Sequence, residues 1–167
     1  FARATYKFNN KYLLTASGRL DGSSRFGDES KYGFFPAASA GWILSEEDFL
    51  RGNITLSLLK LRASYGLTGN QEIGSYNSIT RYQNFGGHSN RTDYVSGSNR
   101  MIGVARANIG NSDLSWESTA SFDIGIDVGL LQNRISFTAD YYNKKTTDLL
   151  LNVSIPATSG HGSILLN

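Results

Sequence analysis

The sequence contains no cysteine and only two prolines among its 167 residues. Without cysteine it can form neither a disulfide nor a thiolate metal site. It has no run of roughly 18 or more apolar residues, so it encodes no transmembrane helix. Its formal net charge is only +2, and the basic residues are scattered along the chain. The electrostatic footprint of a nucleic-acid-binding protein is therefore missing, and we expect no nucleic-acid partner.

Histidine is scarce as well. His88 and His161 are the only two, and both stand in glycine-rich stretches. A hydrolase would need one of them beside an activated serine, and no G-x-S-x-G motif is present. The acidic residues Asp21, Asp28 and Glu29 lack the spacing of an EF-hand loop, so a solvated loop is the simpler interpretation. We therefore predict no catalytic residue, no metal site and no cofactor, and we do not expect an enzyme.

What the sequence does contain favours strands. Glycine is frequent (18 residues), and Tyr and Phe contribute most of the 12% of aromatic residues. Apolar and polar residues alternate with a period of two, as when Tyr12, Leu14 and Leu20 share one face and Thr15 and Arg19 share the other. The same alternation predicts six strands, at Ala2–Phe8, Lys11–Asp21, Tyr32–Leu44, Leu59–Thr68, Trp116–Leu130 and Arg134–Lys144.

The connections between these strands differ in length on the two sides. Two are tight turns, at residues 8–11 and 131–133, and a third, at residues 45–57, is moderate and is expected to hold a helical turn opened by Ser45. The other two are long and polar, at residues 22–31 and 69–115. Because strand directions alternate, the short connections share one side and the long ones the other. Long strands with one apolar face and this loop asymmetry are typical of outer-membrane barrels.

Three long segments of the sequence carry a resemblance to a known family. They are GRLDGSSRFGDESKYGFFPAASAGWILSEEDFL (Gly18–Leu50), LKLRASYGLTGNQEIGSY (Leu59–Tyr76) and NSDLSWESTASFDIGIDVGLLQNRISFTADYYNKKTTDLLLNVSIPATSG (Asn111–Gly160). In sequence and in order they resemble the SusC/RagA family of TonB-dependent outer-membrane transporters. The resemblance covers nearly the whole chain and is weakest at residues 81–109.

The resemblance implies an all-β fold, an antiparallel meander that forms part of a large transmembrane β-barrel. Barrels of this type have about 22 strands and a plugged lumen. The resemblance further implies nutrient uptake across the cell outer membrane of Bacteroidota: import of glycans or peptides, a SusD-like surface lipoprotein as a lid, and energy delivered by TonB. We expect residues 1–167 to be one partial barrel domain, with the plug, the TonB box and the remaining strands outside it.

A soluble β-rich carbohydrate-binding or adhesin module is the alternative, in which apolar faces pack against each other. The two interpretations differ in where six apolar side chains point. A continuous outward belt facing outer-membrane lipid indicates a barrel, and a dry core between two sheets indicates a soluble module. The six residues are Tyr12, Leu14, Phe34, Phe122, Ile124 and Phe137.

The stretch Tyr82–Asn99 mixes aromatic, amide and basic residues. Aromatic faces stack on sugar rings or on peptide side chains, and amides and guanidinium groups bond to hydroxyls and carbonyls. Such a loop suits contact with an oligosaccharide or peptide substrate or with the partner lipoprotein, although an ordinary loop has a similar composition. The residues predicted to make this contact are Tyr82, Phe85, His88, Arg91 and Tyr94.

The segment Asp21–Leu44 is expected to be a loop followed by a strand that re-enters the membrane, with Gly22 and Gly27 supplying the turns of the loop. Tyr32 and Trp42 lie ten residues apart, about one crossing of a tilted strand. With Trp116 they are predicted to be membrane-interface aromatics. The even-numbered residues 34–42 should face lipid, and Gly33, Ala37, Ser39 and Gly41 the lumen. Pro36 cannot donate to a ladder, which predicts a β-bulge there.

The second face of the strands is charged. We expect its side chains to form hydrogen bonds with one another and to line the water-filled lumen of the barrel. The alternative is that they contact a plug or steer a charged substrate. The charged residues are Arg19, Asp21, Lys60, Arg62, Glu117, Asp123, Asp127, Arg134 and Asp140.

Overall fold

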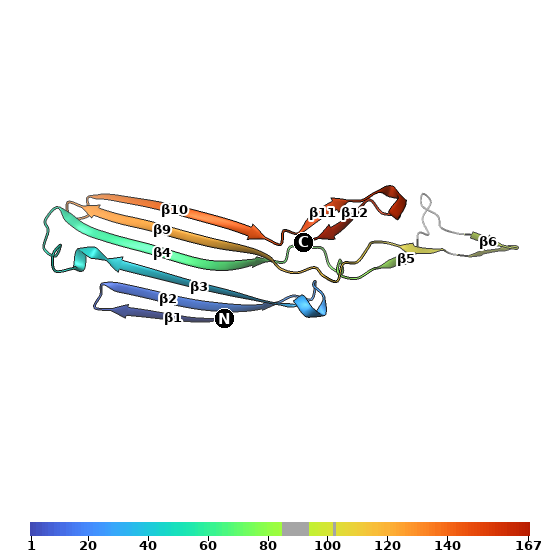
Figure 1. The fold of residues 1–167 in the computed structure, drawn as a ribbon, viewed down its shortest axis with the longest axis horizontal. Coiled ribbons are helices and arrows are strands. Elements are labelled where there is room, and N and C mark those ends of the chain that lie inside the picture. Colours follow the sequence, from blue (N-terminus) through green and yellow to red (C-terminus); the bar gives the residue numbers. More distant parts are fainter. Residues whose placement is uncertain (85–93, 102) are drawn as a thin grey trace. The chain divides into compact units, whose positions relative to one another are not determined.

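The computed structural model describes residues 1–84, 94–101 and 103–167, and in these ranges the regular secondary structure consists mainly of β-strands (Figure 1). The only helical elements in the described ranges are three single 3₁₀ turns. No helix in the described part of the chain is long and apolar enough to cross a membrane.

Six long strands form one sheet in the order β1-β2-β3-β4-β9-β10, so each strand lies beside its neighbour in the meander. This confirms the six predicted strands and the antiparallel fold class, with boundaries that shift by up to three residues. The strands are β1 (Ala2–Phe8), β2 (Tyr12–Gly22), β3 (Tyr32–Ile43), β4 (Leu56–Asn70), β9 (Glu117–Leu130) and β10 (Ile135–Thr147).

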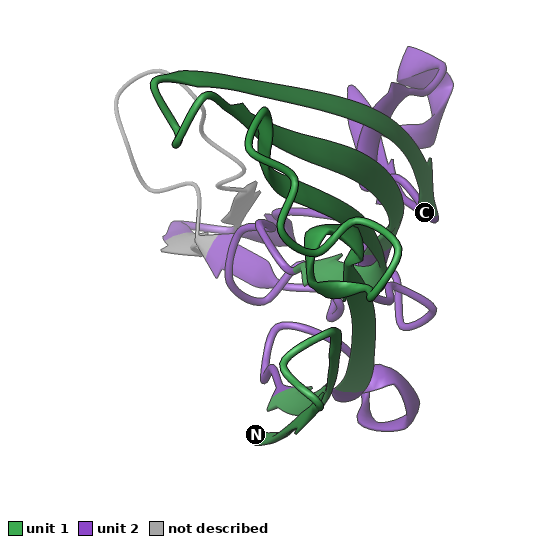
Figure 2. Ribbon diagram, turned by 90° about the vertical axis from the view of Figure 1, so that its left-hand side faces the viewer, with its two compact units in different colours: residues 1–21, 33–70, 118–147 green, residues 22–32, 71–117, 148–167 purple. Residues whose placement is uncertain are grey.

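The chain divides into two compact units (Figure 2). The first holds the sheet, in residues 1–21, 33–70 and 118–147, and the second holds residues 22–32, 71–117 and 148–167. The second unit contains three small hairpins that the alternation did not predict. They pair β5 (Tyr82–Asn84) with β8 (Val104–Arg106), β6 (Tyr94–Ser96) with β7 (Asn99–Met101), and β11 (Leu151–Ser154) with β12 (Ser163–Leu166).

Both predicted tight turns are present. Asn9 and Asn10 adopt positive φ angles of 47° and 56°, a backbone region that Asn tolerates better than most residues. Lys11 N donates to Phe8 O at 3.0 Å and closes this turn. The second turn uses residues 131–133, all with positive φ, and Arg134 N donates to Leu131 O at 3.2 Å.

The helical turn at residues 45–57 begins earlier than predicted. The 3₁₀ turn η2 spans Leu44–Glu46, its N-cap is Ile43, and no side chain caps it. The prediction that Ser45 opens the turn is therefore wrong. The backbone gives the reason: Ile43 N donates to Lys11 O at 2.8 Å, so β3 stays paired up to the residue before the turn.

Gly27 has a different role from the one predicted. Its φ is −64°, which any residue adopts, so it does not supply a left-handed turn. Instead, a Cβ at this position would lie 2.6 Å from the carbonyl oxygen of Ser112. The glycine allows two backbone segments of the second unit to approach closely. The following residues, Asp28–Ser30, form the 3₁₀ turn η1.

The pairing of β3 with β2 has no net insertion around Pro36, and on the side of β4 the predicted bulge stays a prediction. Ser23 N bonds to Lys31 O near one end of β3, and Ile43 N bonds to Lys11 O at the other. Between these two bonded pairs, β2 and β3 advance by the same number of residues. Neither strand therefore contains a net inserted residue relative to the other. On the other side, the register with β4 runs from Ala37 to Ile43. Pro36 lies just beyond this register, where its missing N–H costs no bond of that ladder.

The buried apolar residues gather mainly in the second unit. Phe26, Ile73, Leu114 and Trp116 are buried there, and Leu114 is fully enclosed. The rings of Phe26 and Trp116 lie 5.3 Å apart at a tilt of 50°. In the described residues of the sheet, Phe35 is the one large apolar side chain that is buried. A sheet with so little core leaves its apolar face uncovered by this chain.

Candidate functional site

The apolar face of the six-stranded sheet is open. All six side chains that distinguish a barrel from a soluble module are exposed, by between 40% and 62%. None of them packs into a dry core, so the arrangement that the soluble alternative requires is absent from the described part of the chain. They are Tyr12, Leu14, Phe34, Phe122, Ile124 and Phe137.

The middle of this face is built from alanines. Ala4 pairs with Ala16 across β1 and β2, and Ala40 pairs with Ala63 across β3 and β4. These small side chains leave an open apolar depression of about 750 Å³, bordered by larger side chains such as Tyr65. The face therefore carries no charged group at its centre, as a surface in contact with hydrocarbon requires.

An aromatic row runs along the end of this face that carries the short turns. Successive rings stack from Tyr6 to Phe8, from Phe8 to Tyr12 and from Tyr12 to Trp42, with centroids 6.2–6.4 Å apart. Aromatic rings with one polar atom prefer the boundary between hydrocarbon and water. The row lies where the sequence predicted one interface aromatic, Trp42.

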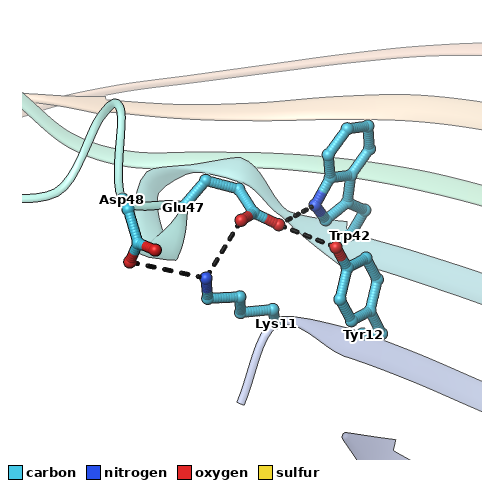
Figure 3. A network of polar contacts seen from close by, with 5 residues as sticks. All are labelled: Lys11, Tyr12, Trp42, Glu47 and Asp48. Carbon is cyan, nitrogen blue, oxygen red and sulfur yellow. Dashed lines mark hydrogen bonds and ion pairs between the residues drawn. The ribbon is translucent and has the colours of Figure 1, made fainter. Parts of the chain in front are cut away.

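The carboxylate of Glu47 accepts hydrogen bonds from two members of this row and from a neighbouring lysine (Figure 3). This carboxylate accepts from Lys11 Nζ at 2.9 Å, from Tyr12 OH at 2.9 Å and from Trp42 Nε1 at 3.0 Å. The bond from Lys11, followed by those from Trp42 and Tyr12, lowers the pKa of Glu47 from 4.5 to about 2. The bond to Glu47 also raises the pKa of Lys11. Asp48 adds a weaker ion pair with Lys11 at 3.8 Å.

The opposite face is polar and bonded to itself. Arg62 on β4 pairs with Asp127 on β9 at 2.9 Å and with Asp140 on β10 at 2.9 Å. Thr138 donates to Asp127 at 3.1 Å, and Arg19 pairs separately with Asp21 on β2 at 2.7 Å. These contacts agree with the predicted hydrogen-bonded polar wall.

Phe35 is an apolar residue on the polar side. It is only 7% exposed, and Arg19 lies 5.7 Å above its ring centroid. A Cβ at Gly69 would overlap the ring, so the ring occupies the space that this glycine leaves. The alternation of β3 did not account for Phe35, because its partners lie on other strands.

The predicted loop residues are only partly described. Tyr82 lies in β5 with an exposed side chain, and Tyr94 lies in β6. Phe85, His88 and Arg91 lie outside the described residues. Contact of these five residues with a substrate or partner stays a prediction.

The predicted interface aromatics have different surroundings. Tyr32 and Trp42 are exposed, whereas Trp116 is only 8% exposed and packs against Phe26. Trp116 thus presents no open ring surface, and it lies one residue before β9 begins. Glu47, which organises the row around Trp42, was not predicted from the sequence. Acidic residues after a strand are too common to signal such a role.

Around His161, the described residues show no arrangement typical of hydrolysis. Ser159 Oγ bonds to Pro156 O at 2.8 Å and to the backbone of His161, not to the imidazole ring. In the described ranges, no group of three or more His, Cys, Asp or Glu side chains is placed to hold a metal ion.

The family model of the TonB-dependent receptor-like β-barrel matches residues 1–166. The chain belongs to this family. Along its full length it is 45% identical to TonB-dependent receptor P39 of Formosa agariphila, and this match covers 15% of that protein. It is 38% identical over 156 residues to TonB-dependent receptor SusC of Bacteroides thetaiotaomicron, covering 93% of the chain and 15% of SusC.

Chains of solved RagAB structures have the same fold. A chain of the RagAB peptide transporter superposes with a TM-score of 0.84 at 32% identity, over 98% of this chain and 17% of that one. A chain of the RagAB peptide importer in the closed-closed state gives a TM-score of 0.85 at 33% identity. The chain spans only about 15–17% of the length of these relatives.

Proposed function

We propose that residues 1–167 form part of the wall and outer connections of an outer-membrane barrel that imports glycans or peptides. The proposal rests on the different chemistry of the two faces of the six-stranded sheet. One face is apolar and exposed, and the other is a polar face whose charges pair across three strands. Such a sheet suits lipid on one side and channel water on the other.

The proposed side of the membrane for each connection follows from its length. The short turns beside the aromatic row face the periplasm, and the long connections at residues 22–32, 71–117 and 148–167 lie outside the cell. There they contact substrate and a SusD-like lipoprotein lid, and TonB acts through a plug and TonB box beyond residues 1–167. The names of the relatives, a SusC receptor and the RagAB peptide importer, support this assignment.

Cysteine labelling in intact cells tests the proposal, because residues 1–167 contain no cysteine of their own. In the full barrel, Ser75→Cys in a long connection should react with a membrane-impermeant maleimide. Arg51→Cys near the short turns should react only after the outer membrane is opened. A neighbouring surface lipoprotein should co-purify with the barrel. Equal labelling of both sites in intact cells, or neither barrel nor label in the outer-membrane fraction, would contradict the proposal.

A further inference from the structure

A small polar cleft lies within the second unit. Its volume is about 270 Å³, and it is formed by the β11–β12 hairpin, residues 107–109 and Asn77. The polar side chains that line it are Asn77, Asn108, Asn152, His161 and Ser163. Among the residues that the structure describes, no Asp, Glu, Lys or Arg lines the cleft.

One wall of the cleft is held in place by an asparagine. Asn108 Oδ1 accepts from Arg81 N at 2.8 Å, and its Nδ2 donates to Ile79 O at 3.1 Å. Asn108 thus uses both the oxygen and the nitrogen of its side-chain amide to join its own segment to residues 79–81. The neighbouring Asn111 donates from Nδ2 to Leu165 O at 3.1 Å. This bond ties that segment to the hairpin that forms the other wall.

The hairpin wall is fixed through its backbone. Asn152 pairs with Leu165 in the register of β11 and β12. Ile155 N donates to Gly162 O at 3.1 Å, and Ser159 Oγ accepts from His161 N at 3.3 Å. These bonds position His161 by its main chain and leave its imidazole ring uncommitted.

Four polar side chains remain unused. Asn77, Asn152, His161 and Ser163 line the cleft, yet their side chains make no hydrogen bond or ion pair within the part of the chain that the structure describes. An amide, an imidazole and a hydroxyl can each both donate and accept. The cleft therefore combines firmly held walls with free groups of both polarities.

These properties favour a neutral ligand whose own groups also donate and accept. The adjacent hydroxyls of a sugar ring have this character. A peptide is usually recognised through backbone groups, at a strand edge or in a nest that captures its terminus, whereas the groups left free in this cleft are side chains. Its volume lies near the lower end of small-molecule sites, roughly 300–1,000 Å³. Ile109 and Ile164 add apolar surface for the C–H face of a ring.

We propose that this cleft binds one or two rings of a neutral saccharide on its way into the barrel. The inference rests on the proposed import function and narrows its substrate class from glycan or peptide to glycan.

The test uses the full-length barrel in detergent, with isothermal titration calorimetry. The probes are neutral di- and trisaccharides (maltose, cellobiose, xylobiose and maltotriose) and the uncharged capped peptide acetyl-Ala-Ala-Ala-amide. We expect a saccharide to bind, and Asn152→Ala and His161→Ala each to weaken its binding roughly tenfold through lost hydrogen bonds. Asn143→Ala is the matched control, because Asn143 is exposed on β10 and outside the cleft. Heat stability of the variants reports any loss of folding.

Three results would overturn the inference: no binding of any saccharide, saccharide binding that both variants leave unchanged, or binding of the capped peptide that both variants weaken. Each is compatible with correct cysteine labelling and lipoprotein co-purification, so the inference can fail while the proposed import function stands. Mislocalisation of the barrel would instead remove the proposed function itself.

Discussion

The guanidinium group of Arg62 lies directly over Gly125. A Cβ at residue 125 would overlap Asp140 Oδ1 and would come within 2.9 Å of Arg62 Nη2. Arg62 stands on β4 and its partner Asp140 stands on β10, so the side chain has to cross β9 to make the ion pair. The missing side chain of Gly125 gives it the space, which is one recognised use of glycine within a strand.

Gly125→Ala should therefore displace Arg62 from Asp140. Because both partners are partly exposed, we expect the loss of the ion pair itself to lower stability only slightly. Heat denaturation of the folded barrel in detergent measures it. In a double-mutant cycle, Gly125→Ala and Asp140→Asn should not add, since both remove the same contact.

Gly41→Ala is the control for this cycle. A Cβ at Gly41 would meet its neighbours no closer than 3.5 Å, an ordinary contact distance. It should leave the Arg62 pair unchanged and add fully to Asp140→Asn. Full additivity of Gly125→Ala with Asp140→Asn would show that the glycine does not serve the Arg62 contact.

The long strands could be predicted from the sequence because each offers many alternating positions. β4 and β9 have 15 and 14 residues, enough for the two-residue period to stand out. The strands of the small hairpins have only three or four residues, such as Leu151–Ser154. Too few positions alternate there for the pattern to differ from an ordinary loop.

The contacts of the site could not be predicted in the same way, because they depend on pairing. Tyr12 and Lys11 are 35 and 36 residues from Glu47 along the chain. Only the meander brings the turn after β1 beside the turn after β3. The role of Gly125 likewise appears only once β4, β9 and β10 are placed side by side. Local alternation gives the faces of a strand but not its neighbours.

Protonation of Glu47 should loosen the contact with Trp42 only in strong acid. The pKa of Glu47 is about 2 in the folded protein and 4.5 as its ordinary value. A lowered folded pKa means that the carboxylate stabilises the fold fully above about pH 4.5. This stabilisation is lost progressively as the pH falls toward 2. The indole N–H resonance of Trp42 should accordingly titrate with a midpoint near pH 2.

Two variants check the origin of this titration. Glu47→Gln should abolish it, because the amide does not ionise, and should weaken the contact with Lys11 at neutral pH. Glu46→Gln should leave it unchanged, since the Glu46 side chain is exposed and makes no hydrogen bond or ion pair within the described residues. A midpoint near 4.5 in the unaltered protein would mean that the three donors do not hold the Glu47 carboxylate in solution.

Gly69→Ala should strain the packing around Phe35. The added Cβ would overlap the aromatic ring, which is buried beneath Arg19 and has little room to move. Overpacking of this kind costs typically about 1–3 kcal/mol. We expect a lower unfolding temperature for the single variant and partial recovery in Gly69→Ala/Phe35→Leu, whose smaller side chain gives back space. If Phe35→Leu lowers the unfolding temperature equally in both backgrounds, the two residues are not packed as described.

The two faces of β3 should respond oppositely to an arginine at adjacent positions. Ala38 pairs with Tyr65 on the apolar face, and Ser39 pairs with Ser64 on the polar face. Both lie near the middle of the strand, where an arginine facing lipid costs about 2–4 kcal/mol. Ala38→Arg should therefore reduce the amount of folded barrel in the outer membrane, measured by the heat-dependent shift of its band on a gel. Ser39→Arg should leave it close to normal, because its charge is solvated by channel water. If Ser39→Arg reduced the amount of folded barrel more than Ala38→Arg did, or if both reduced it equally, the apolar face of this sheet would not be the one that contacts lipid.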